Sequence, residues 1–368
     1  MSIQKHQLTD AEKKYLDDTM NKVSRSFAIV VLSLEEPLNT ALATAYLICR
    51  VVDNIEDCAQ PFAWKEQRFR EFHRLVEEPA SAPQILAVWS QESWPGLTQD
   101  ESDMMGQVSG SILWEIYAKI PEGSRAIIGR WASEMADGML RVEDPDQHPL
   151  LENRDGVRVL AAESDYNEYC FYVAGTVGHM ATELVVVHYG LADDVASRLS
   201  ATCEACGRGL QKTNIVKGFA EDLGRGISYL PYTWHREADC APLSLAGAPV
   251  EWKKKVIDDV VRELHDATEY ILALPYDAAG YRMASLMSLL PAYQTLLLAA
   301  KRHDTLFTSE HHVKISRATM AKCQWDAHSM LADNDAVTRY SRQLEGEINA
   351  AMAGRGARKG FGHRSPHG

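Results

Sequence analysis

The sequence predicts an all-α fold, and three observations lead to this prediction. Apolar residues recur with the period of an α-helix along most of the chain. The period-two alternation of a half-buried strand is found only at residues 226–230. The 368 residues include 46% hydrophobic and 24% charged residues, which are the proportions of a globular protein with a sizeable core. We therefore expect a bundle of about ten to twelve helices.

The N-terminal part is expected to contain five helices. Thr9 and Glu12 form a capping box at the start of the first helix, and Pro61 opens the third. Pro, Ser and Gly interrupt residues 79–95, which we expect to form a loop with short turns. The five helices are expected at residues 9–24, 38–58, 61–78, 101–119 and 123–142.

The C-terminal part is richer in apolar helices, one of which resembles a membrane span. Residues 283–300 contain no charged side chain, but they include Pro291 and several hydroxyl groups. Their length of about 18 residues is at the lower limit for crossing a bilayer, so we expect a buried core helix instead. The helices of this part are expected at residues 166–189, 195–222, 251–274, 283–301 and 317–352, with a loop at residues 236–249.

Charge and cysteine content exclude several classes of protein. The formal net charge of −13 argues against a nucleic-acid-binding protein, because neutralising phosphates requires clustered Lys and Arg. The seven Cys residues are odd in number and follow no disulfide or zinc pattern. The first residues also lack the apolar core of a signal peptide. We therefore expect helix-packed thiols in a reducing cytoplasm.

Two acidic segments are candidates for binding metal ions. Asp53, Glu56 and Asp57 share one face at the end of the second expected helix, where unpaired carboxylates would repel one another. Asn214, Glu221 and Asp222 share a face of a later helix. Hard divalent cations remove such repulsion, and Mg²⁺ commonly combines one or two carboxylates with substrate phosphate. A solvated acidic helix end is the alternative for each segment alone.

Together the two segments predict a more specific site. Antiparallel helices of a bundle can direct both acidic faces into one central cavity. The flanking residues are apolar, so this cavity would have hydrocarbon walls and a charged mouth. Such a cavity suits a long hydrocarbon chain with a diphosphate head group.

Four elements, in order over residues 20–320, resemble the motifs of squalene and phytoene synthases. Ser24-Arg25-Ser26-Phe27-Ala28 is similar to an early element of that family. Residues 46–57 resemble its first aspartate-rich region, and residues 169–178 its Tyr-Cys-x-Tyr-Val-Ala-Gly signature. Residues 211–222, followed by Tyr229-Leu230-Pro231, resemble the second aspartate-rich region. The resemblance implies an isoprenoid-synthase helical bundle in one domain, residues 1–352.

This resemblance also implies a set of site residues. Two farnesyl diphosphates would bind head to head, with Mg²⁺, or Mn²⁺ in its place, held by Asp53, Glu56, Asp57, Asn214, Glu221 and Asp222. Arg25 and Arg50 would contact phosphate and act in catalysis, and Lys217 and Arg225 would add substrate contacts. The remaining substrate contacts implied are Ser24, Ser26, Phe27, Tyr46, Val173, Val177 and Gln211, with Leu290 as a further apolar lining residue.

The reaction implied is the condensation of two farnesyl diphosphates to presqualene diphosphate, followed by NADPH-dependent reduction to squalene. Tyr169 is the candidate for proton transfer, assisted by released diphosphate, although its position also suits a packed aromatic residue. Residues 313–317 favour squalene synthases, in which the Lys and Arg of this element are associated with NADPH. Lys314 and Arg317 are therefore the expected NADPH contacts, for which a solvated basic helix start is the alternative. Asn214 is also expected to bind a cofactor, as one of the Mg²⁺ ligands. Phytoene or dehydrosqualene synthases, which need no reductant, are the alternative activity.

One position departs from the family pattern Asn-x-x-Arg-Asp-x-x-Glu-Asp. Residues 214–222 read Asn-Ile-Val-Lys-Gly-Phe-Ala-Glu-Asp, so Lys217 replaces Arg and Gly218 replaces Asp. Glycine supplies no metal ligand and costs about 1 kcal/mol relative to Ala within a helix. Three interpretations remain open: an enzyme with a reduced second metal site, an inactivated enzyme, or a non-catalytic relative that acts as a binding or assembly protein.

The last residues bear on localisation. Residues 353–368 are Gly-rich and basic, and we expect them to be disordered. Eukaryotic squalene synthases carry a C-terminal membrane anchor, for which we find no counterpart in this sequence. We expect a cytoplasmic protein whose Arg355, Arg358, Lys359 and Arg364 could touch an anionic membrane during product release, each contributing about 1 kcal/mol or less. A tail without a role is the alternative.

Overall fold

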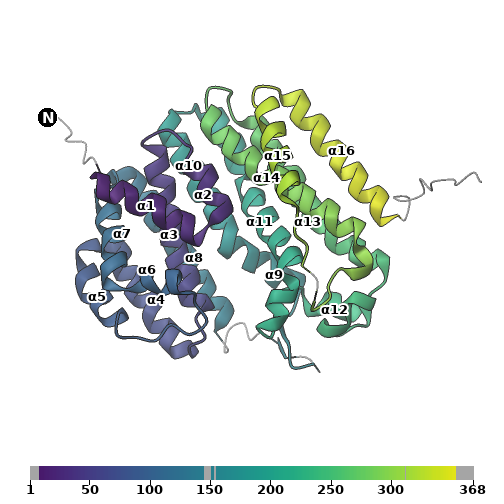
Figure 1. The fold of residues 1–368 in the computed structure, drawn as a ribbon, viewed down its shortest axis with the longest axis horizontal. Helices are drawn as coiled ribbons and strands as arrows, with labels where there is room; N and C mark the ends of the chain where they lie inside the picture. The colour runs from purple at the N-terminus through teal and green to yellow at the C-terminus, as the bar shows by residue number, and fades with distance from the viewer. Residues whose placement is uncertain (1–7, 145–150, 153–154, 311, 354–368) are drawn as a thin grey trace, which may run out of the picture.

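The computed structural model describes residues 8–144, 151–152, 155–310 and 312–353, and it is almost entirely helical (Figure 1). The all-α prediction is therefore confirmed. Within these residues the chain forms sixteen α-helices, more than the ten to twelve expected. The larger number arises because three predicted helices are interrupted and because three short helices, at residues 25–31, 82–89 and 232–238, lie largely outside the predicted ones. The expected tail at residues 353–368 lies almost wholly outside the described residues.

The N-terminal half contains eight helices, and the first of them begins at the predicted capping box. Thr9 Oγ1 accepts a hydrogen bond from the Glu12 amide, and the Glu12 carboxylate accepts one from the Thr9 amide in return. The helices are α1 (Asp10–Val23), α2 (Arg25–Val31), α3 (Leu38–Asp57), α4 (Phe62–Glu77), α5 (Ala82–Trp89), α6 (Gln99–Met105), α7 (Gln107–Lys119) and α8 (Glu122–Glu143), with a short 3₁₀ turn at η1 (Pro79–Ser81).

The C-terminal half contains the remaining helices and most of the cavity wall. They are α9 (Glu163–Cys170), the π-helical segment η2 (Phe171–Gly175), α10 (Thr176–Tyr189), α11 (Asp193–Gly224), α12 (Tyr232–Ala238), α13 (Val250–Ala273), α14 (Ala279–Lys301), α15 (Arg317–Ser329) and α16 (Asn334–Met352). Short 3₁₀ turns lie at η3 (Pro242–Gly247) and η4 (His303–Thr305). A small sheet orders β1 (Leu151–Glu152), β2 (Arg158–Val159) and β3 (Ile227–Ser228), with β1 antiparallel and β3 parallel to β2.

The predicted helices at residues 101–119 and 166–189 are interrupted, at Gly106 and at η2. Two further predicted boundaries are also wrong. Residues 79–95 are not only loop, because Pro83 is tolerated in the first turn of α5 and the helix buries Ile85, Leu86 and Trp89. The predicted helix at residues 317–352 is two helices. The second begins at Asp333, whose side chain accepts a hydrogen bond from the Ala336 amide at 2.8 Å.

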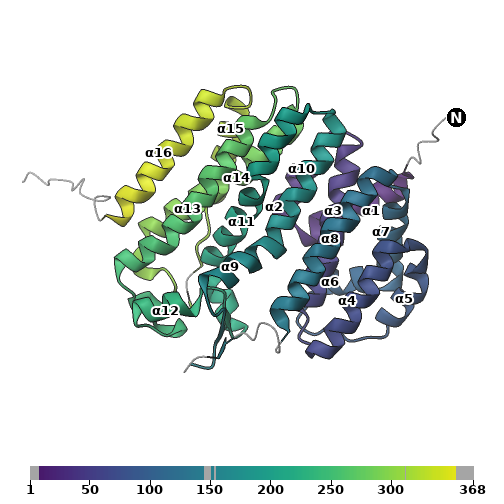
Figure 2. The ribbon, with the colours of Figure 1, turned by 180° about the vertical axis from the view of Figure 1, so that it is seen from behind.

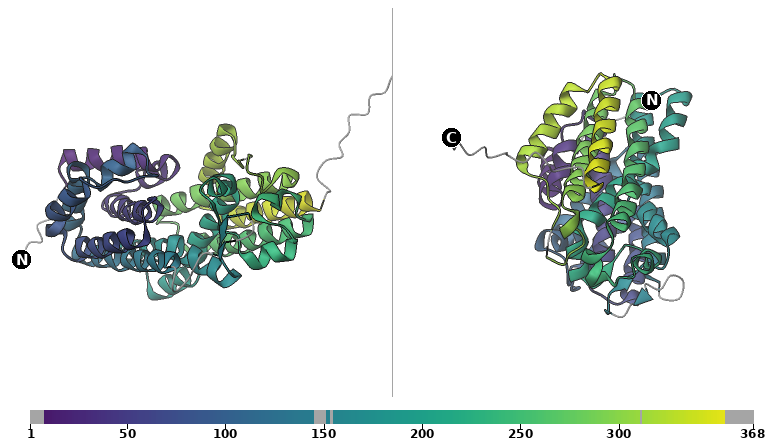
Figure 3. Two further views of the ribbon diagram at one scale, coloured as in Figure 1. Left: turned by 90° about the horizontal axis from the view of Figure 1, so that it is seen from below. Right: turned by 90° about the vertical axis from the view of Figure 1, so that its right-hand side faces the viewer.

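Helix α11 runs through the centre of the molecule and is its longest helix, with 32 residues (Figure 1). The reverse view shows α10 beside it on one side, with α8 packed on α10, and α13 and α14 on the other (Figure 2). Helices α1–α7 lie at one end of the molecule, and α12 to α16 lie at the other (Figure 3). Helix α3, which carries the first acidic segment, packs on α8 and α10.

The π-helical segment packs closely against both α8 and α11. A Cβ atom on Gly207 of α11 would lie 1.8 Å from the Ala174 carbonyl oxygen, and one on Gly138 of α8 would lie 1.9 Å from the Tyr172 ring. The Tyr172 hydroxyl also accepts a hydrogen bond from Arg141 at 2.9 Å. These contacts fix η2 between α8 and α11.

Two helical stretches in the described part of the chain are long and apolar enough to cross a membrane, residues 163–189 and 279–301. The second is α14, which packs against α11, α13, α15 and α16. Of the 18 most apolar consecutive residues of this stretch, 61% are buried. The expectation that residues 283–301 form a buried core helix agrees with this packing.

The close contact at Gly207 can be tested by substitution. Gly207→Ala should lower the free energy of unfolding by about 2 kcal/mol, because overpacking against the Ala174 carbonyl exceeds the gain in helix propensity. Gly346→Ala is the matched control, since no heavy atom lies within 4 Å of its added Cβ, and it should stabilise α16 by about 1 kcal/mol. Urea unfolding measures both values; equal stabilisation by the two substitutions would contradict the described packing.

Candidate functional site

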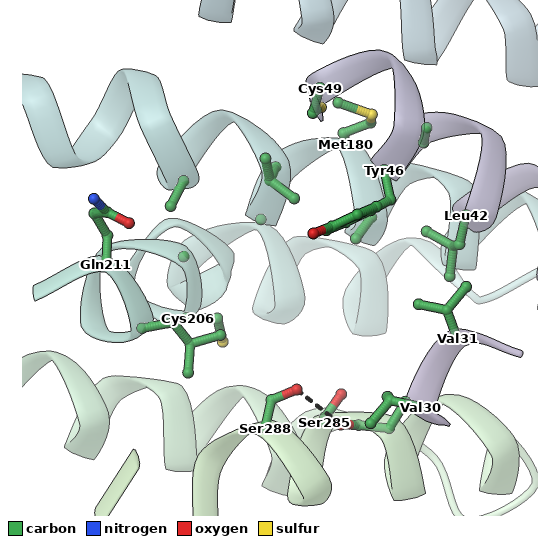
Figure 4. Close-up of a pocket in the computed structure, with 18 of the residues that line it drawn as sticks. Val30, Val31, Leu42, Tyr46, Cys49, Met180, Cys206, Gln211, Ser285 and Ser288 are labelled. Carbon is green, nitrogen blue, oxygen red and sulfur yellow. Dashed lines mark hydrogen bonds between the residues drawn. The ribbon is translucent and has the colours of Figure 1, made fainter. Parts of the chain in front are cut away.

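An apolar cavity of about 480 Å³ lies between α2, α3, α10, α11, α13 and α14 (Figure 4). Tyr46 of α3 points into it from one wall, and Ser285 and Ser288 of α14 lie on the opposite wall. Its apolar side chains come from every one of these helices and include Val31, Leu42, Val173, Val177, Met180, Leu264 and Leu289. The cavity therefore matches the expected hydrocarbon-lined pocket.

One part of the cavity wall is polar. Tyr46, Arg50 and Asp53 recur at helical spacing along α3, and all three line the cavity. Arg50 donates a hydrogen bond to the Tyr46 hydroxyl at 3.1 Å, and its Nη1 lies 3.6 Å from Asp53 Oδ2. Gln211 and Asn214 of α11 complete this polar part. An apolar chain with a charged head group could thus be accommodated in one orientation.

The two acidic segments are joined by one arginine. Arg225 Nη1 lies 2.5 Å from Asp57 Oδ1, at the end of α3, and Arg225 Nη2 lies 2.8 Å from Asp222 Oδ1, in the last turn of α11. Asp57 lies one helical turn beyond Asp53, and Asp222 lies two turns beyond Asn214. The segments therefore face each other, as expected for a shared site.

The surroundings of several of these carboxyl groups do not fully compensate the negative charge of their ionised form. Burial raises the pKa of Asp53 to about 6, in spite of Arg50. Burial also raises the pKa of Asp222 to about 6, although Arg225 opposes this effect. The pKa of Glu56 is raised well above its usual value by burial and by the charges of Asp57 and Glu143. Such carboxylates would gain from an added cation.

Sequence reasoning missed two residues that hold the first acidic segment. Lys65 of α4 donates one hydrogen bond to the Glu56 carbonyl and another to the Glu143 carboxylate, the latter at 2.7 Å. Lys65 is buried, and it ties the ends of α3 and α8 together. Neither residue belongs to a recognisable motif. The only indication in the sequence is a Lys in the first turn of the helix that follows the acidic segment.

The oxygen atoms of the two acidic segments are of the kind that Mg²⁺ prefers, but they do not form a complete metal site by themselves. Within the described residues, no group of three or more His, Cys, Asp or Glu side chains is arranged to hold a metal ion. The donors available are oxygens of Asp53, Asp57 and Asp222, and Mg²⁺ often takes only one or two carboxylates and completes its shell with water and substrate phosphate. The residues therefore fit Mg²⁺ bound together with a diphosphate.

Tyr169 lies on the acidic side of the site, and it is not among the described residues that line the cavity. Its ring stacks on Tyr229 with 4.4 Å between centroids, and only 5% of the residue is exposed. Burial, the neighbouring Tyr229 and the charge of Glu56 raise the pKa of Tyr169 well above its usual value. A phenol with a raised pKa keeps its proton near neutral pH and can donate a hydrogen bond.

The predicted substrate contacts fall into three groups. Ser24, Tyr46, Val173, Val177 and Gln211 line the cavity. The backbone of Arg25, Ser26 and Phe27 begins α2, but their side chains lie outside the described structure. The expected lining role of Leu290 is wrong, because a step of one residue turns a helix by about 100° and Leu289 faces the cavity instead.

The remaining predicted residues are more exposed. Lys217 is exposed and donates a hydrogen bond to Asn214 Oδ1 at 3.3 Å. Glu221 does not join the Arg225 contacts, and its Oε1 lies 3.5 Å from His312 Nδ1. This contact places the segment before α15 beside the end of α11. Lys314 and Arg317 follow it directly in the sequence, and both are exposed.

Gly218 lies in open space. An added Cβ would meet only Asp222 Oδ2, at 4.0 Å. Among the described residues, no atom of another element lies within 4 Å of that Cβ, and the helix around it is uninterrupted. Packing around the Cβ position therefore gives no reason for glycine here.

Hydroxyl groups on the far wall were also missed. Ser285 and Ser288 donate hydrogen bonds to the carbonyls of Tyr281 and Ala284, at 2.9 and 3.1 Å. Tyr270 and Tyr281 line the same wall, with 3.2 Å between their hydroxyl oxygens. In the sequence they appear as ordinary polar positions of a core helix, so only the fold reveals that they face the cavity.

The raised pKa of Asp53 predicts a pH-dependent stability. Between the unfolded pKa near 4 and the folded pKa of about 6, the folded protein binds more protons, so the free energy of unfolding should fall as pH rises through this range. Asp53→Asn should reduce this fall, to which Asp222 and Glu56 also contribute, and should stabilise the ligand-free protein at pH 7.5 by about 2 kcal/mol.

Urea unfolding at several pH values measures this effect. Asp18→Asn, at an exposed position of α1, is the control and should change stability by less than about 0.5 kcal/mol. If Asp53→Asn lowered stability at pH 7.5, the ion pair with Arg50 would outweigh the burial of Asp53.

Comparison with known proteins relates this site to a family. The family model described as squalene/phytoene synthase matches residues 20–319. The squalene synthase of Eremothecium gossypii is 31% identical over 232 residues, which cover 62% of this chain and 48% of that protein. The squalene synthase LSS of Botryococcus braunii is 28% identical over 324 residues, covering 85% of this chain and 63% of that protein. The chain thus spans about half the length of the first of these relatives.

Solved structures show the same fold. The squalene synthase TcSQS, in complex with a ligand, has a TM-score of 0.73 at 22% identity and covers 94% of this chain and 100% of that one. A dehydrosqualene synthase in complex with a ligand has a TM-score of 0.60 at 18% identity, covering 87% of this chain and 96% of that one. Because the family model matches well over half of the sequence, this chain belongs to the squalene/phytoene synthase family.

Proposed function

We propose that this chain joins two molecules of farnesyl diphosphate head to head to give presqualene diphosphate, and then reduces this product to squalene with NADPH. The observation that carries the proposal is the position of the two acidic segments. They are joined by Arg225 beyond the polar part of an apolar cavity. Membership of the family and the squalene synthases among its relatives support the same activity.

In the first step the carbon–oxygen bond of one allylic diphosphate breaks, and the electron pair leaves with diphosphate. Arg50 and Arg225 form ion pairs with carboxylates of the site, and we assign them to the phosphate oxygens. Asp53, Asp57, Asp222 and Asn214 would hold Mg²⁺ or Mn²⁺, with Glu56 and Glu221 as further candidates. When bound, the metal ion supplies positive charge that stabilises the departing diphosphate.

The second farnesyl chain then donates the electrons of its double bond to the allylic cation, and loss of a proton closes the cyclopropane ring. Tyr169 is neutral, so the released diphosphate is the more basic acceptor of this proton and the phenol would orient it through a hydrogen bond. The apolar walls formed by residues such as Val173, Val177 and Leu289 exclude water, which would otherwise trap the cation as an alcohol.

The reductive step is assigned to the segment before α15. NADPH, when bound, supplies the hydride for the final cation. The contact between His312 and Glu221 brings this segment beside α11. The exposed Lys314 and Arg317 offer positive charge for the phosphates of a nucleotide.

The products of a defined reaction test the activity. Purified protein is incubated with farnesyl diphosphate and Mg²⁺, with and without NADPH, and the extracted lipids are identified by mass spectrometry. We expect squalene with NADPH and presqualene diphosphate or dehydrosqualene without it. Preferred turnover of geranylgeranyl diphosphate would indicate a phytoene synthase, and the absence of any condensation product would support a non-catalytic role.

Gly218 provides a second test. Gly218→Asp should raise the rate at limiting Mg²⁺ at least threefold, because it adds a carboxylate one turn from Asp222 in a position that is free of contacts. Gly218→Ala is the matched control: it should stabilise α11 by up to about 1 kcal/mol and leave the Mg²⁺ dependence unchanged. Equal rates for all three proteins over a full Mg²⁺ titration would mean that position 218 does not contribute to the metal site.

A further inference from the structure

Arg225 occupies the carboxylate oxygens that a divalent cation would need. Its guanidinium is within 2.5 Å of Asp57 Oδ1 and 2.8 Å of Asp222 Oδ1. It is the C-cap residue of α11, and Gly226, with a φ of +75°, turns the chain directly into β3. The arginine is thus anchored at one end of a rigid helix and reaches across to the end of α3.

The contact of Arg225 with Asp57 can be exchanged at low cost. The Arg225 side chain is 49% exposed and that of Asp57 is 37% exposed, so their ion pair contributes little to stability. Asp222 is more buried, at 12% exposed. A guanidinium binds phosphate as well as it binds carboxylate, through the same two-pronged geometry. A diphosphate arriving from solvent therefore offers Arg225 an equivalent partner.

We propose that Arg225 couples the binding of diphosphate to the binding of divalent cations. Without diphosphate it neutralises Asp57 and Asp222 and competes with a cation for their oxygens. With diphosphate it transfers to the phosphate oxygens and releases both carboxylates. This inference rests on the proposed function, because it takes the diphosphate head group as the ligand of the site.

The coupling has a consequence for the order of binding. Cation affinity is low while the site contains no diphosphate and rises when diphosphate is present, and linkage requires the reverse effect to be equally large. Gly218 strengthens this dependence. In the last two turns of α11 the only carboxylates are those of Asp222, which Arg225 holds, and Glu221, which contacts His312 instead. Cation and diphosphate therefore enter together.

Two binding measurements on the full chain test this proposal without an activity assay. Mn²⁺ binding to the ligand-free protein is followed by the electron paramagnetic resonance signal of free Mn²⁺, and binding of inorganic diphosphate at saturating Mn²⁺ by calorimetry. Arg225→Gln should bind Mn²⁺ alone at least fivefold more tightly than the wild type, and diphosphate at least tenfold more weakly. Arg225→Lys keeps the charge but cannot span two carboxylates, so its Mn²⁺ affinity should lie between those two proteins.

Arg130→Gln is the matched control, because it removes an exposed ion pair with Glu183 outside the site and should change neither affinity. Circular dichroism verifies that each variant is folded. If Arg225→Gln binds Mn²⁺ no more tightly than the wild type, while the wild type binds diphosphate with Mn²⁺, the coupling is wrong and the proposed function stands. If the wild type binds no diphosphate with Mn²⁺, both the coupling and the proposed function are wrong.

Discussion

The ion pairs of Arg225 with Asp57 and Asp222 are the interaction on which the rest of the site depends. They join the end of α3 to the end of α11, two helices separated by most of the N-terminal half of the chain. The surrounding carboxyl groups are partly buried, which raises the pKa of Asp53 and Asp222 and leaves the ligand-free site short of positive charge. A site of this kind favours ligands that bind together with cations. Without such cations, the repulsion between its carboxylates lowers the stability of the protein.

The frame behind the site depends on close backbone contacts. Gly138 and Gly207 allow α8 and α11 to approach the π-helical segment, and this approach sets the position of the adjoining wall residues Val173 and Val177. On the other side, Lys65 fixes the end of α3 by binding the Glu56 carbonyl and the Glu143 carboxylate. Rigid placement of the acidic groups and a dry cavity next to them have the same origin, which is tight helix packing.

Much of this arrangement could be predicted from the sequence. Helical periodicity gave the fold class, and the spacing of Asp53 and Asp57 and of Asn214 and Asp222 placed each set on one helix face. Other features depend on three-dimensional contacts between distant segments. The bridge through Arg225, the role of Lys65 and the choice of Leu289 over Leu290 follow from helix rotation and packing, which no local pattern encodes. The division of α15 from α16 was missed because the cap at Asp333 was not recognised inside a long periodic run.

The central claim is that a diphosphate binds between the two acidic segments while its hydrocarbon chain fills the cavity. A crystal structure with the unreactive analogue farnesyl thiodiphosphate and Mg²⁺ tests it most directly. We expect the diphosphate between Asp57 and Asp222, with Arg225 on its oxygens and the farnesyl chain along Tyr46 and Val177. A diphosphate bound elsewhere, with the ion pairs of Arg225 intact and the cavity empty, would contradict this account.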